Sequence, residues 1–124
     1  MKLITIVCGG RNNDTTEPWA KFFKNTRTNH VIAGGARGAD VIAGAYAIAA
    51  GIKTTVIKPD WDAHGIYAGF ERNVKMAKFA KSLVEEHGGA VQVVAVAGGK
   101  GTAHMLKIGK QYGFKVHLLE GNEG

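Results

Sequence analysis

The sequence predicts an α/β fold, and three observations support this prediction. Short apolar runs rich in β-branched residues alternate with helix-like segments along the whole chain, as in parallel sheets with right-handed crossovers. Glycine supplies 18 of the 124 residues, about twice its average share. Many of these glycines stand in pairs at the ends of the apolar runs. We therefore expect a Rossmann-like, three-layer α/β/α sandwich with a mostly parallel sheet of about five strands. It would span residues 1–120 as one domain, with a flexible tail at 121–124.

The first strand and the first helix are predicted from the opening residues. Residues 2–8 (KLITIVC) are a β-branched apolar run that a glycine pair ends, which is typical of a buried strand. Residues 15–18 then offer a helix start, with a threonine cap and a proline in the first turn. Trp19, Phe22 and Phe23 follow at helical spacing and give this helix an apolar face.

Two more strands and an apolar helix are expected in the middle of the chain. Residues 30–33 (HVIA) predict the second strand, and residues 53–58 predict the third, which Pro59 ends. Residues 39–50 between them are apolar on every side, so we expect a buried helix that ends at Gly51.

The C-terminal half continues this alternation. Residues 71–84 predict a helix with apolar residues on one face and Lys75, Lys78 and Lys81 in solvent on the other. The remaining elements expected are a fourth strand at 91–97, a last helix at 102–112 and a fifth strand at 115–119.

Three of the four strand-to-helix turns combine a glycine pair with a basic residue. Such turns share the carboxyl edge of a parallel sheet, where ligands bind. Glycine lets backbone N–H groups approach an anion, and the next helix N-terminus adds its positive dipole end. At any one of these turns the glycines could be needed only to make the turn tight. Three such turns at the same edge favour a phosphate site. Neither the dinucleotide-binding fingerprint nor the ATPase P-loop motif is present. The expected ligand-binding residues here are Gly9, Gly10, Arg11, Gly34, Gly35, Ala36, Arg37, Gly38, Gly98, Gly99, Lys100, Gly101 and Thr102.

The segment after the third strand, PDWDAHG at 59–65, is too polar for a core and falls on the same expected edge. We expect a loop here that places Asp60, Trp61 and His64 over the sugar or base of a ligand. Trp61 could stack on a base or pack over the sheet, and core packing is the commoner fate of a tryptophan. Arg72 suits bidentate phosphate contact, because its planar guanidinium matches two oxygens.

Five motifs, in this order, resemble one known superfamily over nearly the whole chain: VCGGR at 7–11, GGARGAD at 34–40, PDWDAHG at 59–65, AGFERNVKM at 68–76 and AGGKGTAHM at 97–105. Together they are similar to the SLOG (Smf/DprA–Lonely Guy) superfamily, and most similar to its small bacterial and phage family (YspA-like, cpYpsA-related). The resemblance implies a Rossmann-like fold and a nucleotide-type ligand.

The Lonely Guy enzymes of this superfamily cleave the N-glycosidic bond of nucleoside monophosphates. The resemblance assigns the phosphoribosyl contact to Arg72, with Asn73 next to it in the motif, and the phosphate cradle to residues 98–102. Met105 stands where these enzymes carry the catalytic glutamate. A thioether neither stabilises an oxocarbenium-like centre nor activates water, so this chemistry would need another carboxylate.

Three aspartates are candidates for that carboxylate: Asp40, Asp60 and Asp62. His64 or His104 would transfer the proton at neutral pH. Asp40 also has a structural interpretation, because an acid in the first turn of a helix offsets the helix dipole. Asp40 and Asn73 join the expected ligand-binding residues, and the catalytic candidates retained are Arg72, Asp60 and His64.

Composition limits the classes of partner. The net charge of +6 and the pI near 9.6 permit an anionic ligand or nucleic acid, but no aromatic–basic interleaving favours nucleic acid. The single cysteine, Cys8, excludes an internal disulfide and suits a small buried residue. The scattered histidines predict no metal site, and no cofactor is required. Without a signal segment or membrane-length apolar run, we expect a cytoplasmic protein. Residues 39–50 could pack in the core or join copies into a dimer or tetramer, and we expect a homo-oligomer.

The leading functional hypothesis is binding of a nucleotide or an ADP-ribose-like derivative at the glycine-rich turns, as a sensor or a sequestering protein. One alternative is an N-glycosidase or nucleotide hydrolase that uses the same site. A second alternative is DprA-like binding of single-stranded DNA, in which the basic edge follows the backbone.

Overall fold

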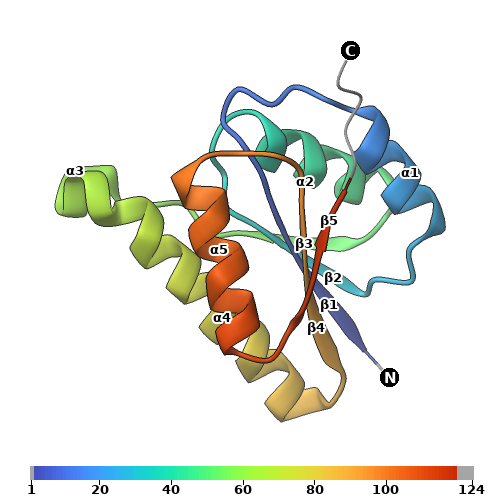
Figure 1. The fold of residues 1–124 in the computed structure, drawn as a ribbon. Coiled ribbons are helices and arrows are strands. Elements are labelled where there is room, and N and C mark those ends of the chain that lie inside the picture. The colour runs from blue at the N-terminus through green and yellow to red at the C-terminus, as the bar shows by residue number, and fades with distance from the viewer. Residues whose placement is uncertain (1, 120–124) are drawn as a thin grey trace.

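A five-stranded, all-parallel sheet forms the centre of the molecule. The computed structural model describes residues 2–119, except the side chains of Ala63, His64 and Ile66, so the tail expected at 121–124 lies outside the described residues. The strand order is β3-β2-β1-β4-β5 (Figure 1), which confirms the predicted Rossmann-like fold. The strands are β1 (Leu3–Cys8), β2 (His30–Ala33), β3 (Lys53–Val56), β4 (Ala90–Ala95) and β5 (Lys115–Leu118).

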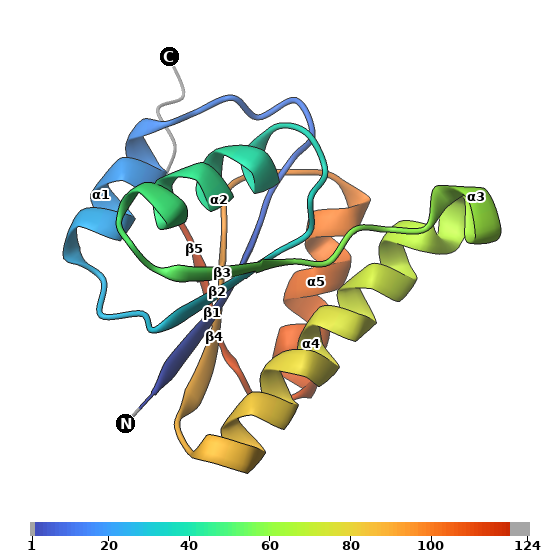
Figure 2. The ribbon, with the colours of Figure 1, turned by 180° about the vertical axis from the view of Figure 1, so that it is seen from behind.

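Helices cover both faces of this sheet and make three layers (Figures 1 and 2). They are α1 (Glu17–Asn25), α2 (Ala39–Ala49), α3 (Trp61–His64), the 3₁₀ helix η1 (Gly65–Tyr67), α4 (Ala68–His87) and α5 (Lys100–Gln111). Side chains alternate along each strand, so Val7 of β1 packs with α1 and α2 while Ile6 packs with α4 and α5.

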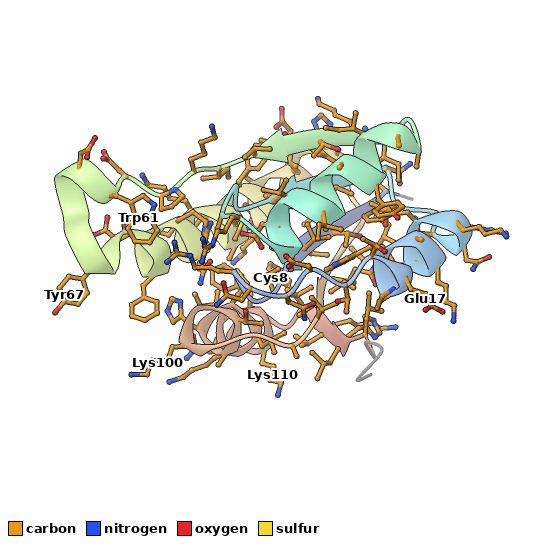
Figure 3. The ribbon with its side chains drawn as sticks, turned by 90° about the horizontal axis from the view of Figure 1, so that it is seen from above. Cys8, Glu17, Trp61, Tyr67, Lys100 and Lys110 are labelled. Atoms are coloured by element: carbon orange, nitrogen blue, oxygen red, sulfur yellow. The ribbon has the colours of Figure 1, made fainter. Side chains whose placement is uncertain are left out.

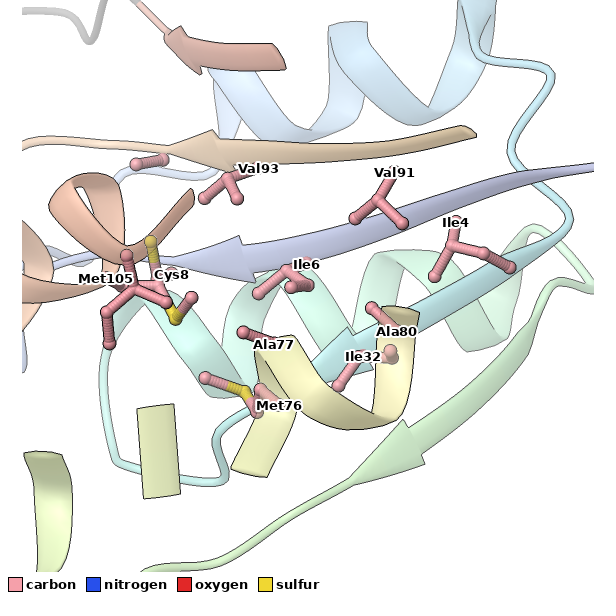
Figure 4. Packing of buried hydrophobic residues seen from close by; sticks show 12 residues of the cluster. Ile4, Ile6, Cys8, Ile32, Met76, Ala77, Ala80, Val91, Val93 and Met105 are labelled. Atoms are coloured by element: carbon pink, nitrogen blue, oxygen red, sulfur yellow. The ribbon is translucent and has the colours of Figure 1, made fainter. Parts of the chain in front are cut away.

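The two faces have differently built cores. Trp19 and Phe23 of α1 fill the first face, together with the alanines of α2. Met76 of α4 and Met105 of α5 meet the strand residues of the second face, where Cys8 also lies (Figure 4). Met105 is fully buried, so its side chain belongs to the core.

The expectation that α2 is buried on every side is wrong. Its buried face consists of small residues, among them Ala43, Gly44 and Ala47, which let the helix lie close to the sheet. The opposite face exposes Val41 and Ile48, at 55% and 64% of their surface. An all-apolar sequence cannot show which of its faces meets the sheet, because every face satisfies the pattern.

The loop expected at 59–65 is also wrong in part, because α3 and η1 occupy most of it. Four-residue helices are too short to display an apolar period. The following helix, α4, begins three residues before its expected start and continues to His87, which brings Phe70 into its first turn.

The strand order places a crevice at the carboxyl edge of the sheet. From β1 the chain crosses by α1 to β2 on one side, while β4 lies against the other side of β1. After β1 the chain continues into α1 on one face of the sheet, and after β4 it continues into α5 on the other face. Such switch points are where open α/β sheets bind ligands.

Candidate functional site

A pocket of about 380 Å³ lies at this switch point. Figure 3 looks down on this edge, with Trp61 and Lys100 at the same end of the molecule. The wall is built from the turns after β1, β2 and β4 and from the first parts of α2, α3, α4 and α5. The lining residues are Cys8, Gly9, Gly10, Arg11, Asn12, Ala36, Asp40, Trp61, Gly69, Phe70, Arg72, Asn73, Met76, Gly99, Lys100, Gly101 and Thr102.

Backbone contacts tie the three glycine-rich turns together under this pocket. The N–H of Gly10 donates to the carbonyl of Ala97 at 3.1 Å, and the N–H of Ala39 donates to the carbonyl of Gly10 at 3.2 Å. A Cβ on Gly38 would lie 2.6 Å from the same Gly10 oxygen, and one on Gly98 would lie 2.6 Å from the Gly10 nitrogen. Several of the predicted phosphate-binding glycines therefore serve close packing between turns.

Gly99 and Gly101 differ from these glycines. A Cβ on either would meet no atom within 4 Å, and the φ of Gly99 is −92°. Packing does not require glycine at either position and neither has a positive φ, yet both line the pocket. They stand at the start of α5, whose first N–H groups lack partners within the helix and carry its positive dipole end.

Arg72 reaches from the first turns of α4 under the turn after β2. Its Nη1 donates to the carbonyl of Gly34 at 2.5 Å, and its Nε donates to Oδ1 of Asn73 at 3.0 Å. Burial lowers the pKa of the guanidinium, and the neighbouring Asp40 opposes this shift. A Cβ on Gly34 would lie 2.6 Å from Cζ of Arg72, so this glycine leaves room for the guanidinium.

Asp40, in the first turn of α2, is a buried carboxylate with weak partners. Its Oδ2 lies 3.7 Å from Nη1 of Arg72 and accepts from the N–H of Ala36 at 3.4 Å. Its Oδ1 is buried and has no hydrogen-bond partner among the described residues. Burial raises the pKa of Asp40 to about 6, although Arg72 lowers it.

Asn73 fixes the neighbouring part of the wall. Its Nδ2 donates to the carbonyl of Gly101 and to Nδ1 of His104, each at 3.1 Å. Because Nδ1 accepts here, the neutral imidazole carries its hydrogen on Nε2. Burial, and then Lys107, lowers the pKa of His104. Its ring centre lies 4.6 Å from that of Phe70.

Two exposed aromatic side chains form the rim. Trp61 is 51% exposed and Phe70 is 38% exposed, and both line the pocket. Of the two positions considered for Trp61, on a base or packed over the sheet, the second is not observed, because α3 holds this residue at the rim of the pocket. Sequence reasoning missed Phe70, although its position outside the apolar face of the helix was a usable signal. It also missed Asn12, for which no sequence signal existed.

The structure separates the other predicted residues from the pocket. Six expected ligand-binding residues do not line it: Gly34, Gly35, Arg37, Gly38, Asp60 and Gly98. Arg37 is exposed and donates from Nη2 to Oδ1 of Asn12 at 2.9 Å. Asp60 borders a shallow depression beside Lys58 and Glu71, and exposed Asp62 is absent from the pocket wall. The side chain of His64 lies outside the described residues.

Cys8 lies at the floor of the pocket, but burial raises the pKa of its thiol and Asp40 raises it further. It stays protonated near neutrality and packs as a small apolar residue. Within residues 2–119, no group of three or more His, Cys, Asp or Glu side chains is arranged to hold a metal ion.

No protein-family model matches this chain, and no curated protein matches it. None of the helices in the described part of the chain is both long enough and apolar enough to span a membrane. The resemblance to the SLOG superfamily rests on the sequence motifs alone.

Proposed function

We propose that this chain is a SLOG-type protein that binds a nucleotide or nucleotide derivative, as a sensor or a sequestering protein. The observation that carries the proposal is the turn at Gly99 and Gly101. Both glycines border the pocket, and the protein's own packing demands neither of them. Glycine in the first turn of a helix lowers helix stability. Close approach of a ligand to the backbone supplies a reason for this composition.

The phosphate end of the ligand would lie at the start of α5. The backbone N–H groups of this first turn are supported by two exposed cations on the wall, Arg11 and Lys100. Anions at helix N-termini are stabilised by these N–H groups and by the helix dipole. Arg72 adds a third positive charge to the pocket wall and is oriented by its bonds to Gly34 and Asn73.

The base would lie against the aromatic rim. An exposed tryptophan and an exposed phenylalanine offer flat apolar surfaces, and stacking of a base on an aromatic ring is worth about 1–3 kcal/mol. The pocket volume of about 380 Å³ falls within the range of small-molecule sites. A compact pocket favours a free nucleotide over single-stranded DNA, which is bound along an extended basic groove.

Asp40 supports a second candidate function, that of an N-glycosidase or hydrolase at the same site. It is a carboxyl group on the pocket wall whose pKa of about 6 suits acid–base chemistry near neutrality. Release of free base from nucleoside monophosphates, lost in the Asp40→Asn variant, would favour this candidate.

Thermal unfolding with a ligand panel tests the proposed function. Nucleoside monophosphates, ADP-ribose and adenosine are each added to the protein, and a ligand at 100 times its dissociation constant stabilises by about 2.7 kcal/mol. We expect the phosphorylated ligands to raise the melting temperature and adenosine to have a much smaller effect. The Trp61→Ala variant should bind about tenfold more weakly. Tyr67→Ala is the matched control, because Tyr67 is an exposed aromatic residue outside the pocket wall. An unchanged melting temperature with every phosphorylated ligand would contradict the proposal.

A further inference from the structure

The carboxylate of Asp40 is the least satisfied polar group on the pocket wall. Its Oδ2 has two long contacts, 3.4 Å to the N–H of Ala36 and 3.7 Å to Nη1 of Arg72, and its Oδ1 has none among the described residues. Asp40 is only 5% exposed. Buried carboxylates ordinarily accept several short hydrogen bonds, so this side chain lacks donors.

The protein groups around Asp40 do not supply these donors. Nη1 of Arg72 is directed to the carbonyl of Gly34, at 2.5 Å. The protonated thiol of Cys8, on β1, is a weak donor for which no hydrogen bond is recorded. Asp40 is also one of the residues that line the pocket. The torsion that turns a carboxylate about its Cβ–Cγ bond is broad, so either oxygen can turn toward a ligand there.

Two parts of the pocket wall therefore require opposite properties of a ligand. The start of α5, with Arg11 and Lys100, attracts negative charge. Asp40 repels a second phosphate once it is ionised and attracts hydroxyl or amine donors. A ligand that satisfies both parts of the wall has an anionic group and, within the same small cavity, a group of neutral donors.

We infer that Asp40 accepts hydrogen bonds from the ribose hydroxyls of the ligand, and that the site selects 5′-ribonucleotides with free 2′ and 3′ hydroxyls. This inference rests on the proposed nucleotide-binding function. A ribose 5′-phosphate places an anion at one end and two hydroxyl donors at the other. A 2′-deoxynucleotide lacks one donor, and a nucleotide within a DNA strand also has its 3′ oxygen esterified.

Isothermal titration calorimetry at pH 8 tests this selectivity on the wild-type chain. The 5′-monophosphates of adenosine, guanosine, cytidine and uridine are titrated first, and the tightest is compared with its 2′-deoxy and 2′,3′-dideoxy analogues. We expect the dideoxy analogue to bind at least about tenfold more weakly, since hydrogen bonds to charged groups are the strong class. Equal affinities for the ribo- and dideoxynucleotides would overturn the inference and leave the proposed function standing. Binding of none of these nucleotides would overturn the inference, and the proposed function would fail with it if ADP-ribose did not bind either.

The Asp40→Asn variant tests whether Asp40 causes the preference for ribonucleotides over dideoxynucleotides. The substitution keeps the shape of the side chain and replaces a charged acceptor with a weaker neutral one. We expect the ribo/dideoxy ratio to fall to about threefold or less, through weaker binding of the ribonucleotide and not of the analogue. Asp14→Asn removes the same charge from an exposed residue outside the pocket and should keep the wild-type ratio. A folded Asp40→Asn protein with the wild-type ratio would overturn the inference. The wild-type comparison decides the matter alone if this variant does not fold.

Discussion

The turn after β2 and the turn after β4 both begin with a glycine pair and contain a third glycine and a basic residue, GGARG at 34–38 and GGKGT at 98–102, yet they use these glycines differently. In the first turn, Gly34 makes room for Arg72 and Gly38 makes room for the turn after β1. In the second, Gly99 and Gly101 face open space at the pocket. A glycine-rich turn at a ligand-binding edge is therefore not by itself evidence of ligand contact. The atoms that an added Cβ would meet show whether a glycine is needed for packing or leaves room for a ligand.

Gly38→Ala should have the largest effect on stability. Gly38 has a φ of +81°, and an added Cβ would lie 2.6 Å from the backbone oxygen of Gly10. Strain in the left-handed region and the backbone overlap together should cost about 3–5 kcal/mol of unfolding free energy. Urea unfolding measures this loss.

Gly51→Ala is the control that isolates backbone strain from overlap. Gly51 has a similar φ of +76°, but a Cβ there would meet nothing within 4 Å. It should cost only about 1–2 kcal/mol. Equal losses of unfolding free energy in Gly38→Ala and Gly51→Ala would show that the close contact of Gly38 with the turn after β1 does not add to the cost. The difference proposed between glycines in packed and in open surroundings would then be contradicted.

Asp40 gives the region of the first turn a pH dependence of its own. Its folded pKa is raised from 3.8 to about 6. Well below pH 3.8 the carboxyl group is protonated in both states and its stabilising contribution is complete. As pH rises through about 6, the folded chain resists ionisation and this contribution is lost. The loss approaches about 3 kcal/mol for a shift of roughly two pKa units.

The Asp40→Asn variant removes this titration. The unfolding free energy of the variant should therefore gain on that of the wild type by up to about 3 kcal/mol between pH 4 and pH 7. Any penalty from leaving Arg72 without its anionic neighbour is the same at both pH values, and His30 and His104 titrate in both proteins. Chemical unfolding at the two pH values measures the gain. A difference that does not change with pH would contradict the raised pKa.

The fold was predictable from the sequence to a greater extent than the site. The β-branched runs and the paired glycines predict all five strands, and the parallel sheet follows from their alternation with helices. The lining of the pocket depends on distant partners. Nothing in the local sequence shows that Arg72 meets Gly34, or that Asp40 lacks a short hydrogen bond. Likewise, the exposure of Trp61 depends on a helix too short to have a visible period.

Gly101→Ala should have the smallest effect on stability, with the opposite sign. Alanine favours the helix by up to about 1 kcal/mol, and somewhat less in its first turn. The new Cβ meets no protein atom within 4 Å, so urea unfolding should show a gain of about 0.5 kcal/mol. The same methyl group would occupy space beside the expected phosphate and weaken nucleotide binding about tenfold.

Ala103→Gly, at an exposed position of α5 outside the pocket wall, is the matched control. It should lower stability and leave nucleotide affinity unchanged. If a glycine is kept for packing, replacing it lowers stability. If it is kept for contact with a ligand, replacing it can raise stability while it weakens binding. If Gly101→Ala bound nucleotides as tightly as the wild type, the proposed contact between the ligand and the turn at 98–102 would be contradicted.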